Sequence, residues 1–142
     1  MEFYKNIIPP RSCILEIGSG TGRLAIPLLR ENLDYHGLDL SKELCDFSNK
    51  KISNYDTKKR IFHQDMRSFQ LDIKFDCIFI AFNSFLHILS DSDAMSTFQS
   101  IKSHLKEGGV FILDILVPNP DFIYRNEENR ELPVMDFKDS RS

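Results

Sequence analysis

The 142-residue sequence lacks the basic excess that a nucleic-acid-binding domain usually shows. Its 18 lysines and arginines are outnumbered by 21 aspartates and glutamates, which gives a formal net charge of −3 at pH 7. It also lacks an apolar run near the ~20 residues that span a bilayer, and its first residues lack the basic and then apolar pattern of a secretion signal. We therefore expect a cytoplasmic protein with no nucleic-acid or membrane partner.

Cysteine is scarce, and the positions of the cysteines exclude two further classes of protein, those held by disulfides and those that bind zinc. Cys13, Cys45 and Cys77 are odd in number, widely spaced and set among apolar neighbours, so they indicate neither a disulfide framework nor a zinc site. His36 and His63 have no second ligand at a recognisable metal spacing, and we interpret them as structural. The sequence predicts no metal.

What the sequence does contain is a regular alternation of short apolar runs and segments with helical periodicity. We expect strands at 12–17, 35–39, 60–63, 75–80 and 110–115, and helices at 23–32, 41–52 and 92–105. This alternation predicts an α/β fold with a doubly wound, mostly parallel, Rossmann-like sheet of about five strands. In such a sheet a ligand binds at the carboxyl ends of the strands, near the point where the strand order reverses.

The helices carry apolar positions that we expect to pack on the sheet. Ser41 is the expected N-cap of the second helix, and Gly108 with Gly109 is expected to end the third. The expected core faces are Leu44, Cys45, Phe47 and Ile52 in the second helix, and Met95, Phe98, Ile101 and Leu105 in the third. The basic residues at 50–51 and 58–60 are interpreted as solvated charge.

The composition changes near residue 117. Residues 118–142 contain three prolines and a polar run, with only short apolar pieces. We therefore divide the chain into a nucleotide-binding domain at 1–117 and an irregular tail at 118–142. A tail of this kind does not supply an antiparallel hairpin, so we expect the sheet to keep an open edge that favours self-association.

Three glycines stand where the first strand turns into the first helix. The segment from Glu16 reads Glu-Ile-Gly-Ser-Gly-Thr-Gly, with Gly18, Gly20 and Gly22 at alternate positions. Glycines let the backbone adopt positive φ and approach a ligand closely. A dinucleotide fingerprint spaces its glycines as G-x-G-x-x-G, which is a different pattern.

Two acids follow the next two strands. Asp39 closes the second strand about 20 residues beyond the glycines, where a carboxylate can accept hydrogen bonds from both ribose hydroxyls, and Leu40 could form one wall for adenine. Asp65 comes after the third strand, where a carboxylate can accept the amino group of adenine and the backbone N–H of Met66 can donate to a ring nitrogen. An NAD-binding enzyme would share Asp39 but has no need of Asp65.

Together these motifs resemble class I S-adenosylmethionine-dependent methyltransferases of the small-molecule type, over residues 14–115. The resemblance implies that S-adenosyl-L-methionine is the cofactor and that Glu16 fixes the glycine loop. It also implies that Arg23 lies near the methionine carboxylate, with Ser19 and Asn83 among the cofactor contacts. The Asn/Asp-Pro-Pro-aromatic motif of enzymes that methylate base amino groups is absent, and Phe-Asn-Ser stands at 82–84 instead.

The function implied is methyl transfer to N or O of a small molecule. His87 is the acid/base candidate near the fourth strand, although a packed or helix-capping histidine is the competing interpretation. Three other functions remain open: an NAD(P)-dependent oxidoreductase, a non-catalytic S-adenosylmethionine-binding protein, and an RNA or protein methyltransferase. In the resembled family, the segment after residue 117 leads into a substrate cap, and we expect its later strands to be missing and activity to be weak.

Overall fold

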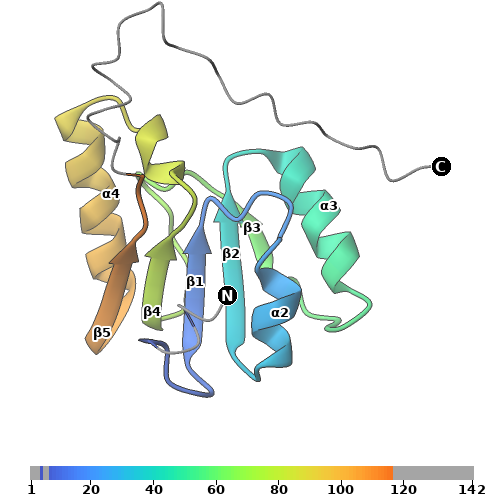
Figure 1. Cartoon of the computed structure of the whole chain (residues 1–142). Coiled ribbons are helices and arrows are strands. Elements are labelled where there is room, and N and C mark those ends of the chain that lie inside the picture. The colour runs from blue at the N-terminus through green and yellow to red at the C-terminus, as the bar shows by residue number, and fades with distance from the viewer. Residues whose placement is uncertain (1–3, 5–6, 117–142) are drawn as a thin grey trace, which may run out of the picture.

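A five-stranded sheet forms the centre of the computed structural model, which describes Tyr4 and residues 7–116 (Figure 1). The strands are β1 (Cys13–Ile17), β2 (Asp34–Asp39), β3 (Ile61–His63), β4 (Phe75–Ile80) and β5 (Leu105–Leu113). Their order is β3-β2-β1-β4-β5, and every neighbouring pair is parallel. The predicted doubly wound α/β sheet is confirmed, and its described part is entirely parallel.

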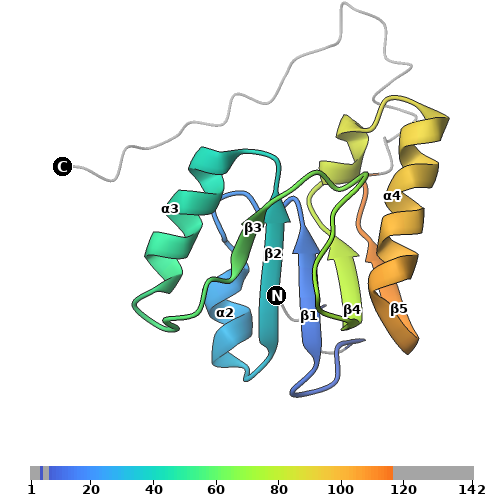
Figure 2. The same ribbon diagram turned by 180° about the vertical axis from the view of Figure 1, so that it is seen from behind.

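The helices lie on both faces of the sheet. They are α2 (Ala25–Arg30), α3 (Lys42–Ile52), α4 (Asp91–His104) and the short 3-10 helix η1 (Ser84–His87). Figures 1 and 2 show α2 and α3 on one face and α4 on the other. The chain winds outward from β1 to β2 and β3 in one direction, and through β4 to β5 in the other. The strand order therefore reverses between β1 and β4, which is where such sheets bind ligands.

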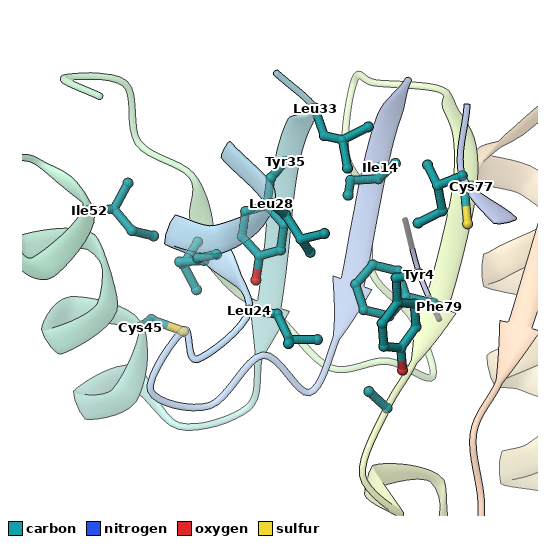
Figure 3. Packing of buried hydrophobic residues seen from close by; sticks show 14 residues of the cluster. Tyr4, Ile14, Leu24, Leu28, Leu33, Tyr35, Cys45, Ile52, Cys77 and Phe79 are labelled. Carbon is teal, nitrogen blue, oxygen red and sulfur yellow. The ribbon is translucent and has the colours of Figure 1, made fainter. Parts of the chain in front are cut away.

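The central strands are apolar on both sides because helices cover both faces. Ile14 and Leu15 are consecutive in β1, point to opposite faces and are both fully buried. Ile14 packs with Tyr35 and Phe79 beneath α2 and α3, as Figure 3 shows for these side chains. Leu15 belongs to the second core, together with Ile78 and with Ile101 of α4. These two cores hold the strand ends that carry the polar residues.

The first two helices differ in part from their sequence-based boundaries and faces. The expected helix at 23–32 is only Ala25–Arg30, because the chain stays in turns through the left-handed Gly22 at φ +65°. Ser41 caps α3 as predicted, since its side chain accepts a hydrogen bond from the Leu44 N–H. Phe47 was wrongly predicted to be core: it is 57% exposed.

The predicted core stripe of α4 is right for Ile101 and Leu105, which pack in the second core, and wrong for Met95 and Phe98. Ile101 is buried, but Met95 is 57% exposed and Phe98 lies at the surface end of an aromatic cluster with Phe85 and Phe111. The spacing of apolar residues predicted the position of the helix. It did not predict how far the sheet beneath the helix extends. Because β5 is the last strand described on this side, the outer part of the stripe extends past the sheet.

The glycines after α4 have a different role from the predicted one. The helix ends at His104, before the glycines are reached, and Leu105 already pairs with Phe75 of β4. Gly108, at φ +74°, lies where the register between β4 and β5 shifts. The glycines therefore accommodate a bulge in β5 rather than ending the helix.

Arg60 was wrongly predicted to be solvated charge, because it is only 6% exposed. Its guanidinium pairs with Asp34 and Asp56 and also donates to the Tyr35 carbonyl oxygen at 3.3 Å. Arg60 is the last residue of the basic run and directly precedes β3. Its side chain is buried there, unlike those of Lys58 and Lys59. A buried cation needs such partners.

Several predictions concern residues outside the described part. The domain boundary at 117, the irregular tail at 118–142 and the missing hairpin stay predictions. Within the described residues, no helix is both long and apolar enough to cross a membrane. The three cysteines are free thiols.

Candidate functional site

The carboxyl ends of the first four strands surround a cavity of about 400 Å³. Gly18 follows β1, Asp39 ends β2, Asp65 follows β3 and Ser84 follows β4, so four segments far apart in the sequence meet here. The remaining lining residues are Leu38, Leu40, Leu44, Gln64, Met66, Arg67, His87, Ile88 and Asp93. The cavity lies at the predicted position, beside the reversal of strand order.

A second groove, of about 530 Å³, lies between α4 and the segment 67–72. It is larger, but its lining is mostly serine, glutamine and other polar surface residues, among them Gln70, Ser96 and Ser100. The glycine turn and both acids of the predicted site are absent from it. We therefore place the candidate site in the smaller cavity.

The glycine turn requires glycines because its backbone adopts positive φ angles. At Gly18 a side chain would also collide with a neighbouring residue. Gly18, Gly20 and Gly22 all have positive φ, between +51° and +74°. A Cβ on Gly18 would lie 2.7 Å from the Ser84 side chain, so the turn after β1 and the turn after β4 are in tight contact. A Cβ on Gly20 would meet nothing within 4 Å, so the backbone there faces open space. Ser19 is different, because its buried side chain lies against Gly37 of β2 and away from the cavity.

Asp39 organises the site as well as lining it. One carboxylate oxygen accepts the Gly20 N–H at 2.8 Å, and the other accepts the Ser41 N–H at 2.9 Å. The acid thus connects the end of β2 to the glycine turn and to the start of α3. A carboxylate has about four acceptor positions, so two remain for hydroxyl groups of a ligand.

Glu16 is buried at the end of β1, two residues before the glycine turn. Its carboxylate accepts a hydrogen bond of 2.6 Å from the hydroxyl of Tyr35, which is itself fully buried on β2. Burial raises the pKa of Glu16 from 4.5 to about 7, against the opposing effects of the Tyr35 hydrogen bond and of the Arg23 charge. Glu16 could be identified from the sequence, but Tyr35 could not, because the pattern of a strand does not predict which hydroxyl group will donate a hydrogen bond to a buried carboxylate.

Asp65 is held by Arg67, another residue that the sequence analysis missed. The Arg67 Nε lies 3.0 Å from each Asp65 carboxylate oxygen, and a second guanidinium nitrogen lies 2.5 Å from one of them. The same guanidinium reaches Asp93 of α4 at 3.4 Å. These contacts lower the pKa of Asp65, chiefly through the Arg67 hydrogen bonds. They fix the carboxylate but also occupy acceptor positions that adenine would use.

Arg23 and the residues after β4 form the other side of the glycine turn. The Arg23 guanidinium lies 3.7 Å from the centre of the Phe82 ring, a cation–π contact that joins the two turns. Phe82 and Asn83 both have positive φ, which is uncommon for residues with side chains. Asn83 does not line the cavity; its side-chain oxygen accepts the Leu116 N–H at 2.6 Å. His87, in η1, does line it.

A separate polar cluster lies at the opposite, amino ends of β1 and β2. Donor atoms of Cys13, Asp34 and His36 lie within 4.8 Å of one another, an arrangement that can hold a metal ion. The Arg60 guanidinium pairs with Asp34 and lies 3.5 Å from His36 Nε2, so a positive charge already fills this position. We therefore interpret the cluster as an ion-pair network. That the protein binds no metal stays a prediction.

The predicted site residues are thus mostly brought together. Gly18, Asp39, Leu40, Asp65, Met66 and His87 line the cavity. Gly20, Gly22, Glu16 and Arg23 lie around or beneath the glycine turn, whereas Ser19 and Asn83 direct their side chains elsewhere. Leu40 is 66% exposed, so it offers an open apolar surface rather than a closed wall.

Comparison with known proteins assigns the fold and the site to a family. Residues 14–109 match the methyltransferase domain family model, and the chain belongs to that family. The resemblance to S-adenosylmethionine-dependent methyltransferases is thereby confirmed, and S-adenosylmethionine is the cofactor of the family. The match covers all five strands except the first residue of β1 and the end of β5.

Particular relatives include a glycine/sarcosine N-methyltransferase from Aphanothece halophytica, 31% identical over 71% of this chain and 39% of its own length. An N,N-dimethyltransferase of a dTDP-amino sugar from Streptomyces venezuelae is 28% identical over 80% of this chain and 46% of its own. Among solved structures, the glycopeptide N-methyltransferase MtfA superposes with a TM-score of 0.69 at 28% identity, covering 79% of this chain and 50% of MtfA. MtfA has also been solved with S-adenosylmethionine and with S-adenosylhomocysteine.

The chain spans less than half the length of these curated relatives. The part matched by the family model, residues 14–109, contains the glycine turn, Asp39 and Asp65. The acceptor of the whole protein is therefore treated below as a proposal.

Proposed function

We propose that the chain binds S-adenosylmethionine in the cavity at the carboxyl ends of β1 to β4, and that the whole protein transfers its methyl group to N or O of a small molecule. The observation that carries the proposal is the convergence of the glycine turn, Asp39 and Asp65 on one cavity. Methyl transfer from a sulfonium needs little acid/base help with a neutral amine acceptor, so positioning is the main task of the protein.

The residues present fit the cofactor in three respects. The open side of Gly20 leaves room for a ligand against the backbone, and Asp39 keeps acceptor positions for two ribose hydroxyls. Asp65 and Met66 line the region after β3 for the amino group and ring of adenine, beside the apolar Leu44. Asp65 must release at least one Arg67 contact to accept that amino group, so we expect Arg67 to turn away on binding.

A small-molecule acceptor is supported by two observations. The segment 82–84 lacks the Pro-Pro motif of enzymes that methylate base amino groups. The relatives named above act, by name, on an amino acid, a nucleotide-linked amino sugar and a glycopeptide. A cytoplasmic location and self-association through the β5 edge are part of the same proposal.

Calorimetry with S-adenosylmethionine, S-adenosylhomocysteine and NAD tests the cofactor assignment. We expect both sulfur nucleotides to bind more tightly than NAD. Tighter binding of NAD would overturn the assignment in favour of an oxidoreductase domain. Binding of the sulfur nucleotides without turnover on any metabolite pool would instead favour a non-catalytic binding protein.

His87 is proposed as the acid/base residue on the acceptor side. It lines the cavity from η1, which follows β4. We expect His87→Ala to reduce turnover on an identified acceptor while leaving S-adenosylhomocysteine affinity nearly unchanged, because the other cofactor contacts remain. Unchanged turnover would remove His87 from the mechanism.

A further inference from the structure

Tyr35 is a fully buried residue of β2 that carries a hydroxyl group, whereas buried strand residues of a parallel sheet are usually apolar. Its ring is fully buried beside Leu28 on the α2 side of β2 (Figure 3). Its hydroxyl donates to the Glu16 carboxylate at 2.6 Å, a short hydrogen bond between two buried side chains. Glu16 is only 3% exposed, so removing this donor would leave a buried carboxylate without the Tyr35 hydrogen bond.

Three ionisable groups act on the pKa of Glu16, and Glu16 acts in turn on that of Tyr4. Tyr35 donates from β2, and Arg23 lies across the glycine turn, so both favour the charged carboxylate. Asp39, at the end of β2, disfavours it. Tyr4 lies on the β4 side, packed against Phe79, and its own pKa is raised, mainly by burial but also by Asp114 and Glu16. The charge of Glu16 is therefore balanced between burial and two partners.

We propose that Tyr35 is a positioning residue for the cofactor: its hydroxyl holds Glu16 as a carboxylate beneath the glycine turn, and this makes cofactor affinity rise with pH across neutrality. The inference rests on the proposed function. It assigns a role to a residue that lines no part of the cavity and acts only through Glu16.

The direction follows from charge. S-adenosylmethionine carries a sulfonium and an α-amino group, both cationic near neutral pH, and a buried carboxylate beside the turn attracts them through a medium of low dielectric. A protonated Glu16 provides no such attraction. Since Glu16 loses its proton near pH 7, affinity should increase over about pH 6 to 8. Without the Tyr35 hydroxyl, the same increase should occur at higher pH.

The test has two arms. In the first, the carboxyl of Glu16 is titrated by carbon-13 NMR in the chain without cofactor, for the native sequence and Tyr35→Phe. In the second, S-adenosylmethionine affinity is measured from pH 6 to 8 for both proteins and for Glu16→Gln. The Gln variant supplies the baseline, because its pH dependence contains the titration of the ligand's own α-amino group but no charge at position 16. Tyr55→Phe is the matched control, since its hydroxyl contacts only Arg30 at the surface.

We expect Tyr35→Phe to raise the Glu16 titration midpoint by about one pH unit and to weaken binding at pH 7 by up to about fivefold, with thermal unfolding showing a folded protein. Tyr55→Phe should match the native protein in both arms. An unmoved Glu16 midpoint, or a pH profile of binding identical to the native one, would overturn the role of Tyr35. Absence of binding at every pH, with a shifted midpoint in the first arm, would refute the proposed function instead.

Discussion

The Asp39 carboxylate accepts the Gly20 N–H at 2.8 Å, so the acid at the end of β2 holds the glycine turn that follows β1. Its other oxygen accepts the Ser41 N–H and so supports the start of α3. The residue predicted to bind ribose is thus also part of the scaffold. Substitutions at this position should affect both cofactor binding and folding.

Replacing Asp39 with Ala should therefore weaken S-adenosylhomocysteine binding by about 1.5 to 3 kcal/mol, the range for hydrogen bonds to a charged group. It should also lower the free energy of unfolding by about 1 to 2 kcal/mol, because two backbone N–H groups lose their acceptor. Calorimetry and urea unfolding measure the two effects. Asp46→Ala is the control, since that exposed acid pairs only with Lys42, and it should leave both quantities unchanged. Full stability in Asp39→Ala would contradict the scaffold role.

The stability of the protein should depend on pH through Glu16. Burial raises the pKa of Glu16 from 4.5 to about 7, so between these values the folded chain binds more protons than the unfolded chain. The free energy of unfolding should consequently fall as pH rises from about 4.5 to 7, by roughly 3 kcal/mol at most, and then level off. Urea titrations from pH 5 to 8 check this. Glu16→Gln should flatten the dependence, and an equally steep slope in that variant would assign it to another group.

Arg60 should be a main support of the β2–β3 edge. Arg60→Ala leaves the Asp34 and Asp56 carboxylates without their guanidinium partner, and we expect the free energy of unfolding to fall by about 2 kcal/mol. Thermal unfolding of Lys58→Ala provides the comparison, because the Lys58 side chain is exposed beside the same network. Equal effects of the two substitutions would show that the buried network contributes nothing specific.

Gly18 and Gly108 share the same φ of +74° but differ in their surroundings. An alanine at Gly108 meets open space and should cost only the backbone strain, about 1 to 2 kcal/mol. An alanine at Gly18 adds a 2.7 Å approach to Ser84, so it should destabilise the chain further and weaken cofactor binding. Denaturant unfolding of both variants gives the difference. Equal costs of the two alanines would show that the approach of position 18 to Ser84 does not limit side-chain size.

Much of the fold could be predicted because most of its strands contain a short apolar run that is visible in the local sequence. The run at 75–80 is apolar except for Asp76, and β4 has those bounds. The stripe of α4 was harder, since a helix pattern carries no information on where the sheet beneath it ends. Phe98 has helical spacing but lies at the edge of the sheet and remains partly exposed.

The site shows the same division between local and tertiary information. Asp39 and Asp65 could be predicted because each follows a strand whose end faces the cavity. Tyr35 and Arg67 could not, because their roles depend on which side chains lie opposite across the fold. A buried arginine such as Arg60 is likewise invisible in a run of basic residues, where composition alone favours solvent.

The close approach of Gly18 to Ser84 has a consequence for how the proposed methyltransferase would bind its two ligands. The turn that lines the cavity at Gly18 and the turn that leads to His87 pack so closely that a Cβ on Gly18 would lie 2.7 Å from Ser84. A ligand that displaces one turn should also displace the other turn. The cofactor and the acceptor should therefore affect each other's binding without direct contact. Their binding should then be cooperative, and by linkage the coupling measured from either ligand should be equal.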